Sequence, residues 1–163
     1  MYYREINMDL FSLPDNYILT HCVSADFALG AGIAVRFKNM GVKDELKRCC
    51  PNEVNTWEKG RCVFTLTNNI VTANLITKRL YWHKPTYQSL GDALYDMKRG
   101  LDTGIYKSNQ IAMPLIGCGL DGLDWNIVRG IIQDMFQHDD LEILVCRYER
   151  QKAQNNLHQQ KLT

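Results

Sequence analysis

The sequence has little net charge, no long apolar run and no secretion signal, and each absence narrows the class of protein. Its 19 basic and 18 acidic residues leave a formal net charge of +1, so no broad field attracts nucleic acid, although local basic patches remain open. No apolar run could span a bilayer, and Met1-Tyr2-Tyr3-Arg4-Glu5 lacks the apolar core of a signal peptide. We therefore expect a cytoplasmic protein, or a nuclear one in a eukaryote, without a membrane partner.

Motifs for metals, disulfides and nucleotide cofactors are also missing. The six cysteines include no C-x-x-C pair, the adjacent Cys49-Cys50 has a poor geometry for a bridge, and the four histidines are scattered. We expect reduced thiols and no metal site. The sequence holds neither a Walker motif nor the G-x-G-x-x-G fingerprint, which argues against ATP hydrolysis and nicotinamide chemistry. We expect no cofactor.

Short apolar runs alternate with amphipathic patterns, which predicts a single α/β domain with a mixed sheet. Thr67-Asn68-Asn69 separates two apolar runs and predicts a hairpin, while Thr86 and Asp124 are suited to cap helices. Strands are predicted over 2–6, 17–22, 62–66, 70–76, 110–113 and 142–148, and helices over 33–39, over 44–49, and from 87 and 125 onward. The inner face of the last helix is expected to hold Ile127, Val128, Ile131, Ile132, Met135 and Phe136.

Two glycine-rich loops, Gly30-Ala31-Gly32 and Gly117-Cys118-Gly119, each follow a predicted strand and precede a helix. Glycine lets a backbone approach a ligand closely, and the free amides at the start of a helix suit an anion. An ordinary tight turn is the commoner explanation of one such loop, whereas two loops together suggest a clamp on a diphosphate as readily as two structural turns. Asp121 would repel a phosphate, so we interpret it as a polariser or base acting on the group that the phosphate carries.

Several motifs resemble those of the macrodomain family, the ADP-ribose-binding fold. They are Asp9-Leu10-Phe11 after the first strand, Gly30-Ala31-Gly32-Ile33-Ala34, and Ile116-Gly117-Cys118-Gly119-Leu120-Asp121. Further segments are similar to the terminal ADP-ribose protein glycohydrolase branch, and the likeness covers roughly residues 3–146 in the same order. These further segments are His21-Cys22-Val23-Ser24, Leu75-Ile76-Thr77-Lys78, His83-Lys84-Pro85-Thr86-Tyr87 and 114–121.

The resemblance implies a three-layer sandwich in which helices flank a mixed central sheet. We expect residues 1–148 to form this single macrodomain and residues 149–163 to be a polar C-terminal tail. Met8 stands where the family usually has a glycine before the adenine-binding aspartate. The asparagine-rich motif of another hydrolase branch is replaced by 21–26, which is consistent with the lysine-dependent branch.

The resemblance also implies the site. Asp9 would hold the adenine amino group, and the two glycine loops would embrace the diphosphate and the distal ribose. Lys78 would be the nucleophile that attacks the anomeric carbon, with Asp121 binding the ribose hydroxyls and assisting proton transfer. The ADP-ribose-binding set it implies is Asp9, Leu10, His21, Ser24, Gly30, Ala31, Gly32, Ile33, Ala34, Pro114, Ile116, Gly117, Cys118, Gly119, Leu120 and Tyr148.

A lysine suits this chemistry only when it is activated. A free amine of this kind has a pKa of about 10.4, so it must be desolvated or deprotonated before it can attack. Once neutral, it can form an imine with a sugar carbon, which a carboxylate cannot. Without the resemblance, the favoured interpretation of Lys78 is a surface lysine at a strand end beside Arg79, His83 and Lys84.

Other candidates carry alternatives of their own. His21, expected at a strand end, is a core histidine or a base. Cys118 is interpreted as a small residue that fits its loop, because no histidine is placed to activate it. Tyr148 is the candidate to pack on adenine, while Cys146 occupies the position where an aromatic is expected. Trp82 could stack on an acceptor base or pack its loop down.

We therefore expect a hydrolase that removes terminal ADP-ribose from acidic side chains, deacylates O-acyl-ADP-ribose, and in a further role acts on nucleobase-linked ADP-ribose in DNA. Its partners would be ADP-ribose and ADP-ribosylated protein or DNA, and the protein would be a monomer. Two alternatives remain, a non-catalytic ADP-ribose reader and a phosphatase for ADP-ribose phosphate, and neither requires Lys78.

Overall fold

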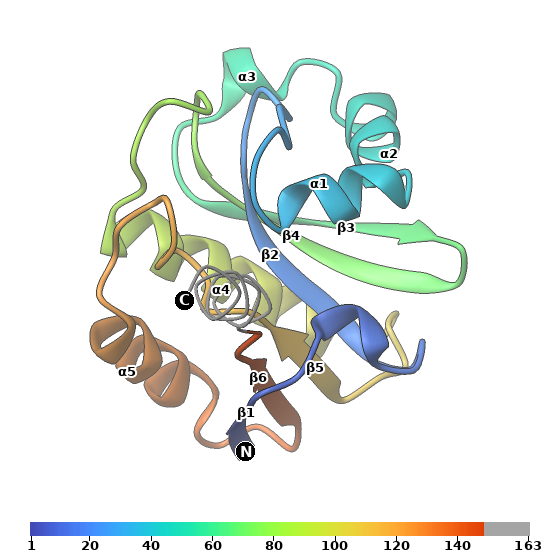
Figure 1. Ribbon diagram of the computed structural model, residues 1–163, viewed down its shortest axis with the longest axis vertical. Helices are drawn as coiled ribbons and strands as arrows, with labels where there is room; N and C mark the ends of the chain where they lie inside the picture. Colours follow the sequence, from blue (N-terminus) through green and yellow to red (C-terminus); the bar gives the residue numbers. More distant parts are fainter. Residues whose placement is uncertain (149–163) are drawn as a thin grey trace, which may run out of the picture.

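The computed structural model describes residues 1–148, in which six strands form one sheet in the order β1-β6-β5-β2-β4-β3 (Figure 1). The strands are β1 (Tyr2–Ile6), β2 (Ile18–Ser24), β3 (Arg61–Thr67), β4 (Ile70–Lys78), β5 (Gln110–Met113) and β6 (Glu142–Cys146). The helices are η1 (Leu10–Ser12), α1 (Ala34–Asn39), α2 (Val42–Cys49), α3 (Glu53–Thr56), α4 (Tyr87–Asp102) and α5 (Trp125–Phe136). The predicted tail, 149–163, lies outside the described residues.

The direction of the strands decides where a ligand can bind. β1, β6, β5, β2 and β4 pair in parallel, and β3 pairs antiparallel with β4. The carboxyl ends of the parallel strands therefore meet at one edge of the sheet, the usual position of ligand sites in α/β folds.

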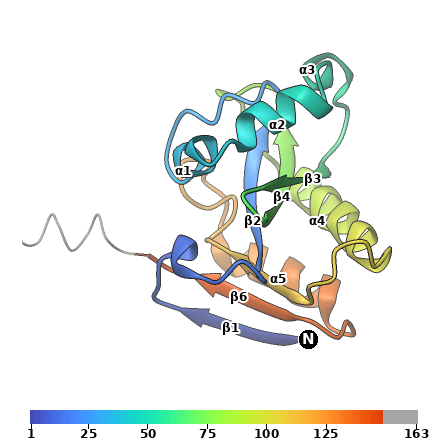
Figure 2. The ribbon, with the colours of Figure 1, turned by 90° about the vertical axis from the view of Figure 1, so that its right-hand side faces the viewer.

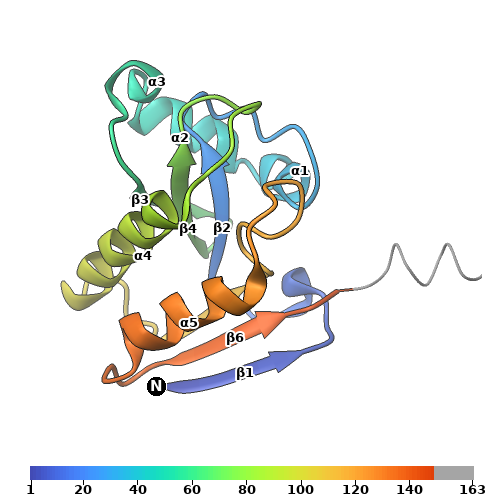
Figure 3. The same ribbon diagram turned by 90° about the vertical axis from the view of Figure 1, so that its left-hand side faces the viewer.

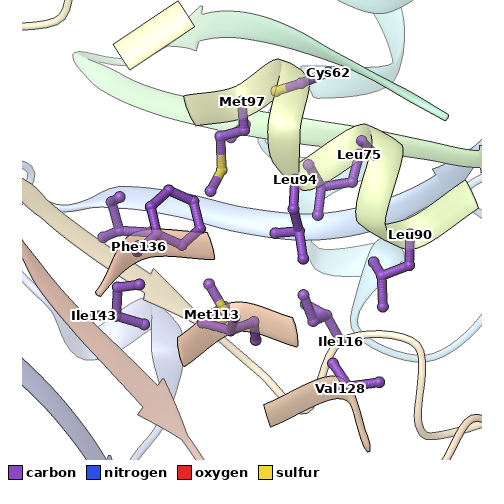
Figure 4. Close-up of a cluster of buried hydrophobic side chains, with 14 of the residues drawn as sticks. Cys62, Leu75, Leu90, Leu94, Met97, Met113, Ile116, Val128, Phe136 and Ile143 are labelled. Atoms are coloured by element: carbon purple, nitrogen blue, oxygen red, sulfur yellow. The ribbon is translucent and has the colours of Figure 1, made fainter. Parts of the chain in front are cut away.

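Both faces of the sheet are covered, because successive side chains of a strand point to opposite sides. Ile18, Leu75 and Ile111 pack in one cluster with α4 and α5, whereas their neighbours Leu19, Ile76 and Ala112 pack in another with α1 and α2. Figures 2 and 3 show the two helix layers on either side of the sheet. Leu94 of α4, Phe136 of α5 and Met113 of β5 lie in the first cluster (Figure 4). This arrangement confirms the expected α/β sandwich.

Local structure departs from the sequence prediction at several points. β2 and β4 each run two residues further than predicted, to Ser24 and Lys78, α2 begins two residues earlier, at Val42, and β6 ends at Cys146 instead of Tyr148. The short helix α3 forms just after Pro51, where no helix was predicted. Ile127 is exposed on α5, because the helix turns only Val128, Ile132 and Phe136 fully into the core. No helix within 1–148 is long and apolar enough to cross a bilayer.

The edge strand β1 is fixed by a half-buried carboxylate, Glu5. It accepts hydrogen bonds from Arg129 of α5 (2.5 Å), from Arg147 after β6 (2.9 Å) and from the Tyr3 hydroxyl (2.6 Å). The Arg129 guanidinium, chiefly, holds the pKa of Glu5 far below its usual range, against the opposing effect of burial. Glu5 thus joins β1, α5 and the end of β6.

The Glu5 network predicts an acid-sensitive contribution to stability. Glu5→Gln should lower the free energy of unfolding at pH 7 by about 2 kcal/mol, because two guanidinium groups lose their carboxylate partner. Because the folded-state pKa is depressed, this contribution is complete above the unfolded-state pKa and is lost as the pH falls through the folded-state value. Denaturant unfolding from pH 7 down to pH 2 should therefore show the wild type and the variant converging. Glu58→Gln, an exposed control, should leave stability unchanged, and an equal loss at every pH would contradict the electrostatic account.

Candidate active site

The chain after β2 and the chain after β4 run side by side at the ligand edge of the sheet. The β2–β4 register pairs Ser24 with Lys78, after an irregularity between Val23 and Ser24. Beyond the strands, Ala25 N donates to Lys78 O (2.9 Å) and Asp26 N donates to Arg79 O (3.1 Å). Lys78 is thereby fixed at the last position of β4, next to the start of the first glycine loop.

Lys78 and Asp121 form a direct ion pair, with 2.7 Å between Nζ and Oδ1. Their side chains are 13% and 19% exposed, so the pair is largely shielded and still reachable from solution. The two residues predicted to act together are 43 positions apart in sequence, and the fold brings them into contact. The arrangement offers an amine and a carboxylate side by side, which is what a nucleophile with an adjacent base requires.

Asp121 reaches Lys78 from the second glycine loop, which is tightly folded on itself. Ile116 N donates to Pro114 O (2.8 Å), Cys118 N to Leu115 O (3.1 Å) and Leu123 N to Gly117 O (2.9 Å). Gly117 has φ +73°, and a Cβ there would lie 3.0 Å from Leu123 Cδ1, so the turn requires glycine. Gly119 and Leu120 are exposed, and Asp124 caps α5 through the amide of Asn126 as predicted.

The first glycine loop is preceded by a strained segment. Phe27 and Leu29 are buried, yet have φ values of 51° and 44°, a region that costs such residues about 1–3 kcal/mol each. Gly30, Ala31 and Gly32 follow as an exposed turn, and Ile33 and Ala34, half-buried, lead into α1. Strain of this kind persists only where surrounding contacts enforce it, and it is common at ligand sites.

Asp26 supplies those contacts and was missed by sequence reasoning. Its Oδ1 accepts from Ser24 Oγ (2.5 Å) and from Ala28 N (3.2 Å), and its Oδ2 accepts from Tyr81 N (3.0 Å). One carboxylate therefore joins the end of β2, the strained segment and the loop that follows Lys78. The sequence signal that could have identified Asp26 is its position, as an acidic residue between a buried strand and a glycine loop.

Two cysteines lie beside the ion pair. The pKa of Cys22 is raised to about 12, mainly by burial and to a smaller extent by the negative charge of Asp121 and by the neighbouring Cys118. Burial, with Asp124 and Asp121, also raises the pKa of Cys118 to about 11. Because a nucleophilic cysteine needs a lowered pKa, both side chains are neutral thiols that fill space between β2 and the second glycine loop.

Asp9 lies at the same edge, after β1, and is engaged by a residue that the sequence did not single out. Arg36 Nη1 donates to Asp9 Oδ1 (3.0 Å) and Oδ2 (2.9 Å), and its guanidinium lies 4.1 Å from the centre of the Phe11 ring. Asp9 also accepts from the Phe11 amide and begins η1. An adenine amino group at Asp9 would therefore share the carboxylate with Arg36.

The structure removes His21 from the open part of the site. Its predicted place at a strand end is wrong, because it lies in the middle of β2 with its ring fully buried against Phe37 and bonded to Asn74 Oδ1 (2.6 Å). Burial lowers the pKa of His21 to about 4, against the opposing effect of the hydrogen bond that its ring donates to Asn74 Oδ1. His21 is thus a neutral core histidine, the alternative that the sequence left open.

The remaining predicted residues divide between core and surface. Leu10, Ser24 and Ile116 are buried, Pro114 is half-buried, and Tyr148 is half-exposed two residues beyond the end of β6. Cys146 is buried close to Asp9, and its pKa is raised to about 11 by burial and by the Asp9 charge. β6 therefore places the Cys146 thiol close to Asp9, the predicted adenine-binding residue. Tyr148 lies two residues further along the chain.

Comparison with known proteins identifies two relatives that are named as ADP-ribose glycohydrolases. No family model matches the chain. The ADP-ribose glycohydrolase OARD1 of Bos taurus and that of Homo sapiens are each 39% identical to the chain over 142 residues, which cover 84% of this chain and 86% of each relative.

Solved structures show the same fold at lower identity. The macrodomain of Mycobacterium tuberculosis DarG matches with a TM-score of 0.77 at 22% identity, over 90% of this chain and 96% of that one. Thermosipho africanus DarTG in complex with ADP-ribose matches with a TM-score of 0.73 at 19% identity, over 90% of this chain and 41% of that one. The chain therefore belongs to the macrodomain family, in its ADP-ribose glycohydrolase branch.

Proposed function

We propose that the protein is an ADP-ribosyl hydrolase that releases terminal ADP-ribose from acidic side chains, with Lys78 as nucleophile and Asp121 as its partner. The observation that carries the proposal is the shielded 2.7 Å contact between these two residues at the edge where both glycine loops begin. The names of the relatives support hydrolysis of an ADP-ribose linkage. A binding protein would need no amine at this position.

In the proposed reaction, the neutral Lys78 amine forms a bond to the anomeric carbon of the distal ribose. The bond from that carbon to the acyl oxygen breaks, and its electron pair leaves with the carboxylate of the acceptor. Loss of a proton from the nitrogen, with opening of the sugar ring, gives an imine, and water then hydrolyses this intermediate to free ADP-ribose and the amine.

Asp121 has two roles in the proposed reaction. In the structure it accepts a hydrogen bond from Lys78, and an ammonium held in this way has no lone pair with which to attack. Ribose hydroxyls that donate to Asp121 would compete for the carboxylate, and the same carboxylate can take the proton that the nitrogen releases. Substrate binding and activation of the nucleophile would therefore be linked through one side chain.

The same geometry suits two further substrates. An O-acyl-ADP-ribose presents the same type of ester, so its deacylation belongs to the proposal. Nucleobase-linked ADP-ribose on DNA is a further candidate, since Tyr81 and Trp82 are exposed in a loop that also holds Arg79, His83 and Lys84 and aromatic side chains beside basic ones can hold single strands.

Replacement of Lys78 tests the reaction class. Lys78→Ala should lower the release of free ADP-ribose from a glutamate-ADP-ribosylated protein at least about a thousandfold, while ADP-ribose binding measured by calorimetry survives. A wild type that binds ADP-ribose but never releases it would make the protein a reader. Wild-type turnover in the variant, or removal of phosphate from ADP-ribose phosphate as the main activity, would refute the lysine mechanism.

The covalent intermediate gives a separate prediction. Borohydride added during turnover should reduce the imine and leave an ADP-ribose adduct on Lys78, which mass spectrometry of a proteolytic digest locates. Asp121→Asn should slow release by about 10²–10⁴-fold, because it removes a proton acceptor and keeps the shape. An adduct on another residue, or unchanged kcat in Asp121→Asn, would contradict the assignment of roles.

A further inference from the structure

A cavity adjoins Lys78 on the side of α4. This cavity of about 320 Å³ is lined by Trp57, Thr77, Lys78, Arg79, His83 and Lys84, together with the first turn of α4. We refer to it as the basic pocket, because three of these side chains are cationic and none is acidic. Apart from Lys78, its lining residues have no role in the ADP-ribose assignments or in the proposed reaction.

Two of the three cations of the basic pocket, Arg79 and Lys84, have no carboxylate partner within residues 1–148. Arg79 Nη2 donates to the Trp57 carbonyl (2.8 Å), and Lys84 Nζ donates to the Leu120 carbonyl, so neither has a carboxylate partner there. His83 Nδ1 accepts from Leu80 N (3.3 Å), which leaves its Nε2 as a possible donor. A cavity with two unpaired cations and a spare donor favours an anion.

The walls of the basic pocket are held in place. The Trp57 indole donates to the Ile76 carbonyl (3.1 Å), and Trp57 in turn anchors Arg79. At Gly60, a Cβ would lie 1.8 Å from the Ser89 carbonyl oxygen, so this segment packs on the first turn of α4 closely enough to require glycine. Thr77 lies almost fully buried in the same wall.

Lys78 connects the basic pocket to the candidate active site. Its amine meets Asp121 of the second glycine loop, and its side chain also lines the basic pocket. Lys84 makes a second connection, since it lines the basic pocket and bonds to Leu120 in that loop. ADP-ribose bound at the glycine loops with its distal ribose at Lys78 would place the linked acceptor at the border of this cavity.

We propose that the basic pocket binds an anionic side chain of the acceptor protein, next to the glutamate or aspartate that carries ADP-ribose. This proposal rests on the proposed function and adds a preference for acidic acceptor sequences. A peptide is favoured over nucleic acid because the cations border one short cavity, not a track for successive phosphates, and the net charge is only +1.

The experiment compares three peptides that each carry one ester-linked ADP-ribosyl glutamate and differ in a flanking residue, Glu, Gln or Lys. The wild type should show about fivefold higher kcat/KM for the Glu peptide than for the Gln peptide, the size expected for one exposed charge pair, and the preference should shrink in high salt. Arg79→Glu should invert the order and favour the Lys peptide. Lys47→Glu, the same charge reversal at an exposed position on α2, should keep the wild-type order.

Each other result would overturn the proposal. Equal rates for all three peptides in the wild type, or an Arg79→Glu variant that slows all three by the same factor, would show that the basic pocket does not read the acceptor. An oligonucleotide that inhibits more strongly than the free acidic peptide, and loses this effect in Arg79→Glu, would assign the cavity to nucleic acid. Binding titrations run in parallel separate the two proposals, since a wild type without turnover refutes the hydrolase yet still reveals any preference for the Glu peptide.

Discussion

The parallel pairing of β2 with β4 is the constraint on which the site depends. It places Lys78 beside Ser24 and continues past both strands through Ala25 and Asp26. Lys78 can then meet Asp121 only if the neighbouring strand β5 ends at the same edge, which the β2–β5 pairing ensures. The first glycine loop leads to α1 and the second leads to α5, on opposite faces of the sheet, so the crevice between them opens over the strand ends.

Within this frame, much of the site is held in a conformation that a free chain would avoid. Phe27 and Leu29 have positive φ, Gly117 can be nothing larger, and Lys78 and Asp121 are largely removed from water. Asp26 compensates locally by accepting three hydrogen bonds from three segments. Such preorganisation is what a site needs if it is to hold a sugar carbon against an amine, because reorganisation then does not add to the barrier.

The sequence predicted the layers of the fold and the pair at its centre, and its failures share a physical cause. Periodicity and caps located every strand and the helices that start after Thr86 and Asp124, since these signals are local. Arg36 on Asp9 and Asp26 beneath Tyr81 depend on contacts between segments 27 and 55 residues apart, which no local pattern encodes. His21 was misplaced because the same residue types occur inside and at the end of a strand, and only pairing with β4 showed where β2 ends.

Lys78 lies between the second glycine loop and the basic pocket, so in the proposed function it would separate recognition of the sugar from recognition of the acceptor. On one side, the backbone amides and small residues of the glycine loops suit the diphosphate and ribose, which every substrate shares. On the other side, the basic pocket presents Arg79 and Lys84, whose charges are held by carbonyl groups and remain unneutralised. The glycine loops would recognise the shared sugar mainly through backbone, and the basic pocket would recognise the acceptor through side chains. The acceptor preference could then change without disturbing the reaction, since Arg79 can be replaced while Lys78 and Asp121 stay in contact.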